Sequence, residues 1–210
     1  MIDPELIAYI EGEILPRYDS FDAAHRRDHA EQVIAESLRL ARLHGCDEGL
    51  CYTIAAYHDV GLVGGREHHH TLSGAILRAD KRLKAWFTDA EITLMAEAAE
   101  DHRASSGHAP RTIYGCIVAE ADRTIEPLVI LRRTVQYGLT HYPDYDREEH
   151  YRRFVEHLIE KYAEGGYLRL WIADPDKEQR LAELRALISD RTTLRTTFDS
   201  LFDEELENKD

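Results

Sequence analysis

Helix start and stop signals recur along this chain, whereas the alternation of apolar and polar residues that marks a β-strand is sustained nowhere. Residues 30–43 are rich in helix formers and stop at His44-Gly45, a usual helix terminator. Asp47 then precedes a mostly apolar stretch, residues 48–59, that predicts a buried helix. This pattern predicts an all-α protein.

Capping residues and prolines indicate further helix boundaries. Thr88 followed by Glu91 forms a capping box, which predicts a helix through residues 92–102. Pro110 suits the first position of a helix through 111–126, and Pro127 marks the bend or end of that helix. The remaining expectations are helices over 148–164 and 176–190, a main internal loop over 61–70, and a solvated acidic tail over 198–210. We expect a single all-α domain with a C-terminal helical extension.

The charge balance restricts the class of partner. The 210 residues include 40 acidic and 26 basic side chains, a formal net charge of −14. A nucleic-acid polymer needs a basic footprint for its phosphates, so such a partner is not expected. A small phosphorylated ligand needs only a local positive site and remains compatible with this charge.

Cysteine usage and the first residues predict a cytoplasmic protein. Cys46, Cys51 and Cys116 form no C-x-x-C pair, which fits a reducing compartment better than a disulfide framework. The N-terminal residues are acidic and interrupted by Pro4, unlike a signal peptide. No apolar run approaches the roughly 18 residues of a membrane span, so no membrane partner is expected.

Metal-type ligands lie on the apolar stripes of four predicted helices. His29, His58, His102 and Asp122 each share a helix face with apolar residues. A single such histidine is as often a core residue that is merely hydrogen-bonded. For the whole set, however, that interpretation requires several buried polar groups, including carboxylates, which are costly unless they are paired or coordinate a metal.

The His58-Asp59 doublet makes the set recognisable. Adjacent residues point in different directions on a helix, so both bind one ion only where the geometry is relaxed at a helix end. The following residues, 60–65 (VGLVGG), supply such an end. An isolated His-Asp pair is a weak signal, whereas an upstream His, then His-Asp, then a distant Asp on helices is much stronger.

The order His29, His58-Asp59, Asp122 resembles the HD superfamily of metal-dependent phosphohydrolases. The strings AAYHDVG and AEADR resemble the second and last motifs of that family. His25 and His29, four residues apart, are similar to the opening motif of the small bacterial HD hydrolases. Near the end, FVEHLIEKY resembles the His-x-x-x-Lys helix that some of these enzymes carry. The resemblance covers approximately residues 20–165.

The resemblance implies a helical bundle with a central metal site. We therefore expect one HD-type domain over 1–210, with a core near 20–165 and an extension over 166–210. It also implies hydrolysis of a phosphoester or a nucleotide pyrophosphate bond. His29, His58, Asp59 and Asp122 are the implied ligands of a divalent ion, for which Mn, Fe, Mg, Ni and Zn all suit the ligand types.

A second ion is an open alternative. Some HD proteins hold two metals through two further histidines, and His70 and His102 occupy the corresponding order here. The neighbours His68 and His69 leave the assignment of His70 uncertain by one or two places. In the other interpretation, both histidines line the cavity and hydrogen-bond the substrate phosphate.

The implied chemistry uses water activated by the ion. Asp59 would bind the ion and orient that water, and His25 or His102 would protonate the leaving oxygen. Glu67, a loop carboxylate near the doublet, is a weaker candidate for the same role.

Basic residues near the motifs supply candidate phosphate contacts. Arg66 and Arg103 are among them, but most such side chains are expected to pair with acidic residues at the surface. Arg123 and Lys161 are the preferred substrate-binding residues, from motif position, together with His70. The expected partner is a small phosphorylated substrate, most simply a nucleotide; the oligomeric state is not predicted.

Two rival functions remain at this point. A two-iron member could be a mixed-valent oxygenase, since some HD proteins with a similar ligand set activate dioxygen. Alternatively, the domain could be a non-catalytic nucleotide or metal sensor. The intact doublet and final aspartate argue against a decayed site.

Overall fold

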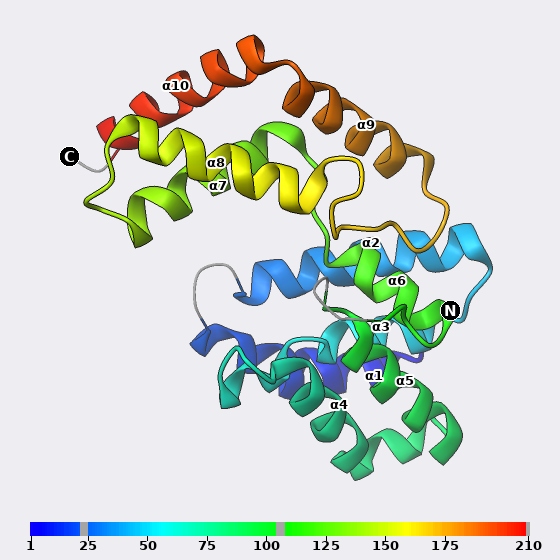
Figure 1. Ribbon diagram of the computed structural model, residues 1–210. Helices are drawn as coiled ribbons and strands as arrows, with labels where there is room; N and C mark the ends of the chain where they lie inside the picture. Colours follow the sequence, from blue (N-terminus) through cyan, green and yellow to red (C-terminus); the bar gives the residue numbers. More distant parts are fainter. Residues whose placement is uncertain (22–24, 104–107, 209–210) are drawn as a thin grey trace. The chain divides into compact units, whose positions relative to one another are not determined.

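The computed structural model describes residues 1–21, 25–103 and 108–208 (Figure 1). Within these ranges every regular element is a helix and no strand occurs, so the all-α prediction is confirmed. None of the described helices combines the length and apolar character needed to cross a membrane. The chain divides into two compact units, Met1–Arg123 and Thr124–Asp210.

This division differs from the predicted boundary. The resemblance placed the end of the core near residue 165, whereas the compact first unit already ends at Arg123. Each unit has buried apolar residues of its own. Whether the chain nonetheless folds as one domain stays a prediction.

The first unit contains six α-helices and four short 3-10 or π segments among its described residues. In chain order they are α1 (Pro4–Tyr9), η1 (Ile10–Ile14), η2 (Leu15–Ser20), α2 (Arg27–His44), α3 (Glu48–Tyr57), η3 (Val60–Gly64), α4 (His69–Ala79), η4 (Lys81–Ala85), α5 (Asp89–Asp101) and α6 (Ile113–Ala121).

Local chemistry explains most of these boundaries. α2 stops where Gly45 adopts a left-handed conformation, φ 66°, which glycine tolerates without a steric cost. The Asp47 side chain accepts the Leu50 N–H and begins α3, a helix buried along most of its length. The capping box that begins α5 is also present. These boundaries were predicted correctly.

The prediction that Pro110 begins a helix was wrong. α6 starts at Ile113, because the Thr112 hydroxyl accepts the Gly115 N–H at 3.2 Å and caps the helix there. Pro127 likewise does not bend this helix but occupies the first turn of the next one.

Up to residue 208, where the described part ends, the second unit contains four helices, α7 (Pro127–His141), α8 (Arg147–Tyr162), α9 (Pro175–Ser189) and α10 (Arg191–Glu207). The prediction of a solvated acidic tail over residues 198–210 was wrong, because most of these residues lie in α10. Phe198, Leu201 and Phe202 of this helix are buried in the apolar core of the unit. The acidic face of α10 is neutralised by arginines; Arg132, for example, contacts Glu204 and Glu205 at 2.6 Å each.

Candidate metal centre

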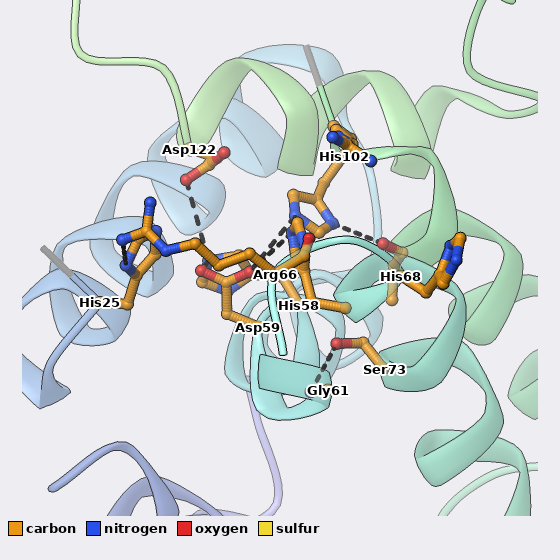
Figure 2. Close-up of polar contacts among 12 residues, drawn as sticks. His25, His58, Asp59, Gly61, Arg66, His68, Ser73, His102 and Asp122 are labelled. Atoms are coloured by element: carbon orange, nitrogen blue, oxygen red, sulfur yellow. Dashed lines mark hydrogen bonds and ion pairs between the residues drawn. The ribbon is translucent and has the colours of Figure 1, made fainter. Parts of the chain in front are cut away.

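Three helices of the first unit end where the predicted ligands lie. His58, His102 and Asp122 are the C-cap residues of α3, α5 and α6. The C-terminus of a helix carries a partial negative charge, so three such ends favour a cation. Figure 2 shows the side chains of these residues and of Asp59 directed toward one another.

The end of α3 allows two adjacent residues to face one point. Asp59 has φ −115° and ψ 5°, outside the helical region, so the backbone turns away from α3 immediately after His58. Both side chains are buried, His58 at 0% and Asp59 at 3% exposure. This is the relaxed helix end that the doublet was predicted to need.

The first group of ligand-type atoms brings together all four residues implied by the resemblance. His29 Nε2 lies 3.1 Å from Asp122 Oδ1 and 3.4 Å from His58 Nε2. His58 Nε2 lies 3.3 Å from Asp59 Oδ2. The side chains of His29 and Asp122 are 22% and 26% exposed, so the group is open to solvent on their side.

A second group surrounds the other oxygen of Asp59. Asp59 Oδ1 lies 3.3 Å from His69 Nε2 and 3.4 Å from His102 Nε2. The two imidazole nitrogens are 3.1 Å apart. Asp59, His69 and His102 therefore form a second set of ligand-type atoms, and Asp59 belongs to both sets.

Hydrogen bonds to the backbone fix the orientation of three imidazoles. In each, Nδ1 faces a carbonyl oxygen three residues earlier in the chain, and Nε2 points to Asp59. Metal-binding histidines usually donate their other N–H in this way. The pairs are His58 with Ala55 at 2.7 Å, His69 with Arg66 at 2.8 Å and His102 with Ala99 at 2.6 Å.

The charges of the first group depend strongly on one another. Burial alone would lower the pKa of His58, but the charges of Asp59 and Asp122 outweigh burial and raise it to about 9. Burial would raise the pKa of Asp122, yet the hydrogen bond from His29 and the charge of His58 lower it to about 2. Burial would also raise the pKa of Asp59, but His58 and His102 hold it below its usual range.

These residues fit a divalent cation. Asp59 Oδ1 is buried, yet none of the described residues places a donor in hydrogen-bonding geometry with it. Such an oxygen is costly without a partner, and a metal ion bound with His69 and His102 would supply one. The imidazole and carboxylate donors suit Mn, Fe, Ni or Zn, and Mg less well.

His69, rather than the predicted His70, lies beside Asp59. α4 begins at His69, and successive side chains of a helix point about 100° apart, so only one of the two can face Asp59. The His70 ring instead lies 5.6 Å from the His69 ring, and burial lowers the pKa of His70. His68 is turned outward, with its side chain 78% exposed. A contact between His70 and substrate stays a prediction.

Two predicted catalytic residues, His25 and Glu67, have different surroundings in the structure. The ring of His25 is 6.0 Å from that of His29, and its Nδ1 is 3.4 Å from an amino group of Arg66 (Figure 2). The Glu67 side chain is 87% exposed and faces His68 at 3.7 Å. His25 is therefore near the ligands, whereas this geometry does not favour Glu67 as an acid.

The two preferred phosphate-binding residues have structural contacts instead. Arg123 is 8% exposed and pairs at 3.1 Å with buried Glu120, one turn earlier on α6. Lys161 lies on α8 in the second unit, with its ammonium 5.1 Å from the centre of the Tyr162 ring. Their roles in substrate binding stay predictions.

Sequence reasoning missed the glycine that positions His69. A Cβ atom on Gly61 would overlap the His69 carbonyl oxygen and lie 2.5 Å from Ser73 N. The Gly61 N–H also donates to the Ser73 hydroxyl at 2.9 Å, so η3 lies directly against the first turns of α4 (Figure 2). A glycine two residues after the doublet was the available signal.

Another missed feature stabilises the end of α5. Asp101 is buried and accepts from the Arg111 backbone N–H at 2.7 Å, while the Arg111 guanidinium lies 2.9 Å from the same carboxylate. This pair connects the residue before His102 to the segment that leads into α6, the helix that ends at Asp122. It therefore connects α5, which ends at His102 of the second group, with α6, which ends at Asp122 of the first group.

Comparison with protein families identifies the central segment. A family model described as HD domain matches residues 26–125, which contain all six ligand-type residues of the two groups. This segment of the chain therefore matches the HD-domain family that the doublet indicated. Members of this family are mostly metal-dependent hydrolases. Neither the curated proteins nor the solved structures gave a match.

Proposed function

We propose that this protein is a metal-dependent phosphohydrolase that acts on a small phosphorylated substrate, a nucleotide or another small phosphoester or pyrophosphate. The observation that carries this proposal is the position of Asp59, whose two oxygens face two separate groups of histidines. The family match supports the general class of reaction. The substrate within that class is our proposal.

The two groups of ligand-type residues would each hold one ion. His29, His58, Asp59 and Asp122 would hold one ion, and Asp59, His69 and His102 a second. When bound, divalent ions of this kind generate a nucleophile from water near neutral pH and polarise the phosphoryl group. Burial of His58 and Asp59 gives these ligands little freedom to move, which favours preorganisation.

Proton transfer to the leaving oxygen falls to His25 in this arrangement. His102 directs its Nε2 at Asp59 and its Nδ1 at Ala99 O, so both nitrogens have partners. His25 lies beside the first group, and a guanidinium nitrogen of Arg66 is 3.4 Å from its Nδ1.

Arg66 is the side chain best placed to bind the substrate phosphate. It lies on the exposed loop between η3 and α4, beside His25, and its guanidinium can bind a phosphate through two parallel hydrogen bonds. A substrate phosphate that attracts Arg66 would release His25 Nδ1.

The activity is tested by assaying nucleotides and small phosphoesters for released phosphate and pyrophosphate with Mn²⁺ and with a chelator. We expect turnover with Mn²⁺ that chelation abolishes. Asp59→Ala should reduce kcat/KM by orders of magnitude, because it removes a ligand of both groups, and should leave the far-UV circular dichroism unchanged.

Asp80→Asn is a matched control. Asp80 is another carboxylate of the first unit, but it accepts hydrogen bonds from the hydroxyls of Tyr9 and Tyr57. This variant should keep its metal content and turnover even if it unfolds at a lower temperature. Equal turnover in metal-loaded and chelated protein would contradict the proposal.

The paired groups also favour a second candidate, the mixed-valent di-iron oxygenase. Asp59 between two histidine sets would suit two irons as well as two other ions. An iron-loaded sample that consumes oxygen in proportion to an organic substrate, without phosphate release, would establish this alternative. Metal binding without turnover of any kind would instead support the sensor.

A further inference from the structure

Two backbone groups at the end of α3, a carbonyl and an N–H, form hydrogen bonds with the same side chain. The Tyr18 hydroxyl donates to the Ala56 carbonyl at 3.0 Å and accepts the Asp59 N–H at 3.2 Å. The last carbonyls of a helix lack partners within the helix. Here the backbone turns away at Asp59, and Tyr18 satisfies groups on both sides of the turn.

The neighbouring carbonyl is used differently. Ala55 O, which could accept the Asp59 N–H if α3 continued, instead faces His58 Nδ1 at 2.7 Å. The helix end is thus built by two side chains, the imidazole of His58 and the phenol of Tyr18. The Asp59 N–H is available to Tyr18 because it does not bond to Ala55 O within α3.

Tyr18 is well fixed and lies outside the family match. It belongs to η2, it is 0% exposed, and its ring lies 5.5 Å from that of Phe21 and 6.2 Å from that of His58. Burial, followed by the charge of Asp59, raises the pKa of Tyr18 well above its usual value, so the hydroxyl keeps its proton. The match begins only at residue 26.

We propose that Tyr18 is a positioning residue for Asp59, holding the doublet in the conformation that directs one carboxylate oxygen to each histidine group. The N-terminal segment that carries Tyr18 is therefore part of the metal centre rather than an appendage to it. This inference rests on the metal sites of the proposed function but does not depend on hydrolysis.

Tyr18→Phe tests the role, because it keeps the ring and removes only the hydroxyl. Co²⁺ is titrated into the metal-free full chain, and binding is followed by calorimetry and by the visible absorption of the ion, which reports its coordination geometry. We expect Co²⁺ to bind about tenfold more weakly, the usual effect of losing a partner that orients a ligand. The visible spectrum should change as well.

Tyr52→Phe is the matched control. Tyr52 is also a buried tyrosine, on α3 itself, six residues before His58. Its phenylalanine variant should bind Co²⁺ with the wild-type affinity and spectrum. The unfolding temperatures of both metal-free variants are measured alongside, so that a general loss of stability is distinguished from a local change at Asp59.

The outcomes distinguish the positioning role of Tyr18 from the existence of the metal centre. Wild-type Co²⁺ affinity and spectrum in Tyr18→Phe would overturn the positioning role and leave the metal centre intact. Weaker binding with an unchanged spectrum in both variants would also overturn it, since the effect would then be one of stability. No Co²⁺ binding by the wild type would overturn the metal centre, and this inference with it.

Discussion

The imidazole of His58 has opposite roles with and without metal. In the metal-free protein, the charges of Asp59 and Asp122 outweigh burial and raise its pKa from 6.5 to about 9. A group whose pKa is higher in the folded state stabilises the fold below its unfolded pKa, and this contribution is lost as the pH rises through the folded pKa. A bound ion requires the neutral ring, so binding must displace this proton.

We therefore predict that the unfolding temperature of the chelated protein falls between pH 6.5 and about 9. With Mn²⁺ present, stabilisation by the metal should instead increase with pH over the same interval, because less proton has to be displaced. Scanning calorimetry across this range with chelator and with Mn²⁺ measures both slopes.

His58→Gln removes the titrating ring and should abolish the fall seen in the chelated protein. His157→Gln is the comparison, since His157 is a half-buried histidine of the second unit whose pKa is lowered by burial. It should retain the wild-type slope. A chelated wild type with no pH dependence in this interval would show that Asp59 and Asp122 do not retain the proton on His58.

Residue patterns predicted the first ligand group better than the second. His29, His58 and Asp122 each share a helix face with apolar residues in the sequence, so their common direction could be inferred even though the limits of α6 could not. His69 and His70 lie where a loop becomes α4, and a shift of one residue in the start of that helix exchanges which of them faces Asp59. Tyr18 carries no metal-binding pattern at all, because its role depends on a backbone turn.

Among the elements, the contact of η3 with α4 determines the second group. A methyl group on Gly61 would meet backbone atoms of His69 and Ser73, which cannot move aside as a flexible side chain can. Gly61→Ala should therefore displace the first turn of α4 and with it His69. We expect two Co²⁺ per wild-type chain and one per Gly61→Ala chain, measured by titration and elemental analysis.

Gly64→Ala provides the control within the same element. Its Cβ would meet only the end of the Leu72 side chain, which can change rotamer. This variant should keep both ions. Loss of both ions in Gly61→Ala would mean that the groups do not form separately, and retention of both would contradict the placement of His69.

Elements whose ends depend on adjacent residues were the predictable ones. The capping box before α5 and the glycine after α2 act within one turn, so they could be read without the fold. α10 was mistaken for an acidic tail because its charges are neutralised by arginines more than fifty residues earlier, Arg132 and Arg147. The apolar residues between those charges are buried in a core that residues of α7, α8 and α9 also form, so their burial likewise depends on residues distant in the sequence.

For the whole molecule, the open point is whether the two units unfold together. The sequence predicted one domain over residues 1–210, whereas the structure divides at Arg123 and gives each unit its own core. The chain contains two tryptophans, and one lies in each unit. Trp86 stacks on Tyr9 at 5.7 Å in the first unit, and Trp171 is half-buried in the second.

Trp171→Phe and Trp86→Phe each leave one tryptophan to report on one unit. All six ligand-type residues lie in the first unit, so Mn²⁺ at a hundred times its Kd should stabilise that unit by about 2.7 kcal/mol. For a unit of the length of Met1–Arg123, the Trp86 transition should move up by about 4 °C for each kcal/mol. We expect the Trp171 transition to stay where it is in the chelated protein, because the second unit contains none of these ligands.

Equal shifts of both transitions would show instead that the 210 residues unfold as the single domain predicted from the sequence. A shift seen only by Trp171 would contradict the assignment of the metal centre to the first unit.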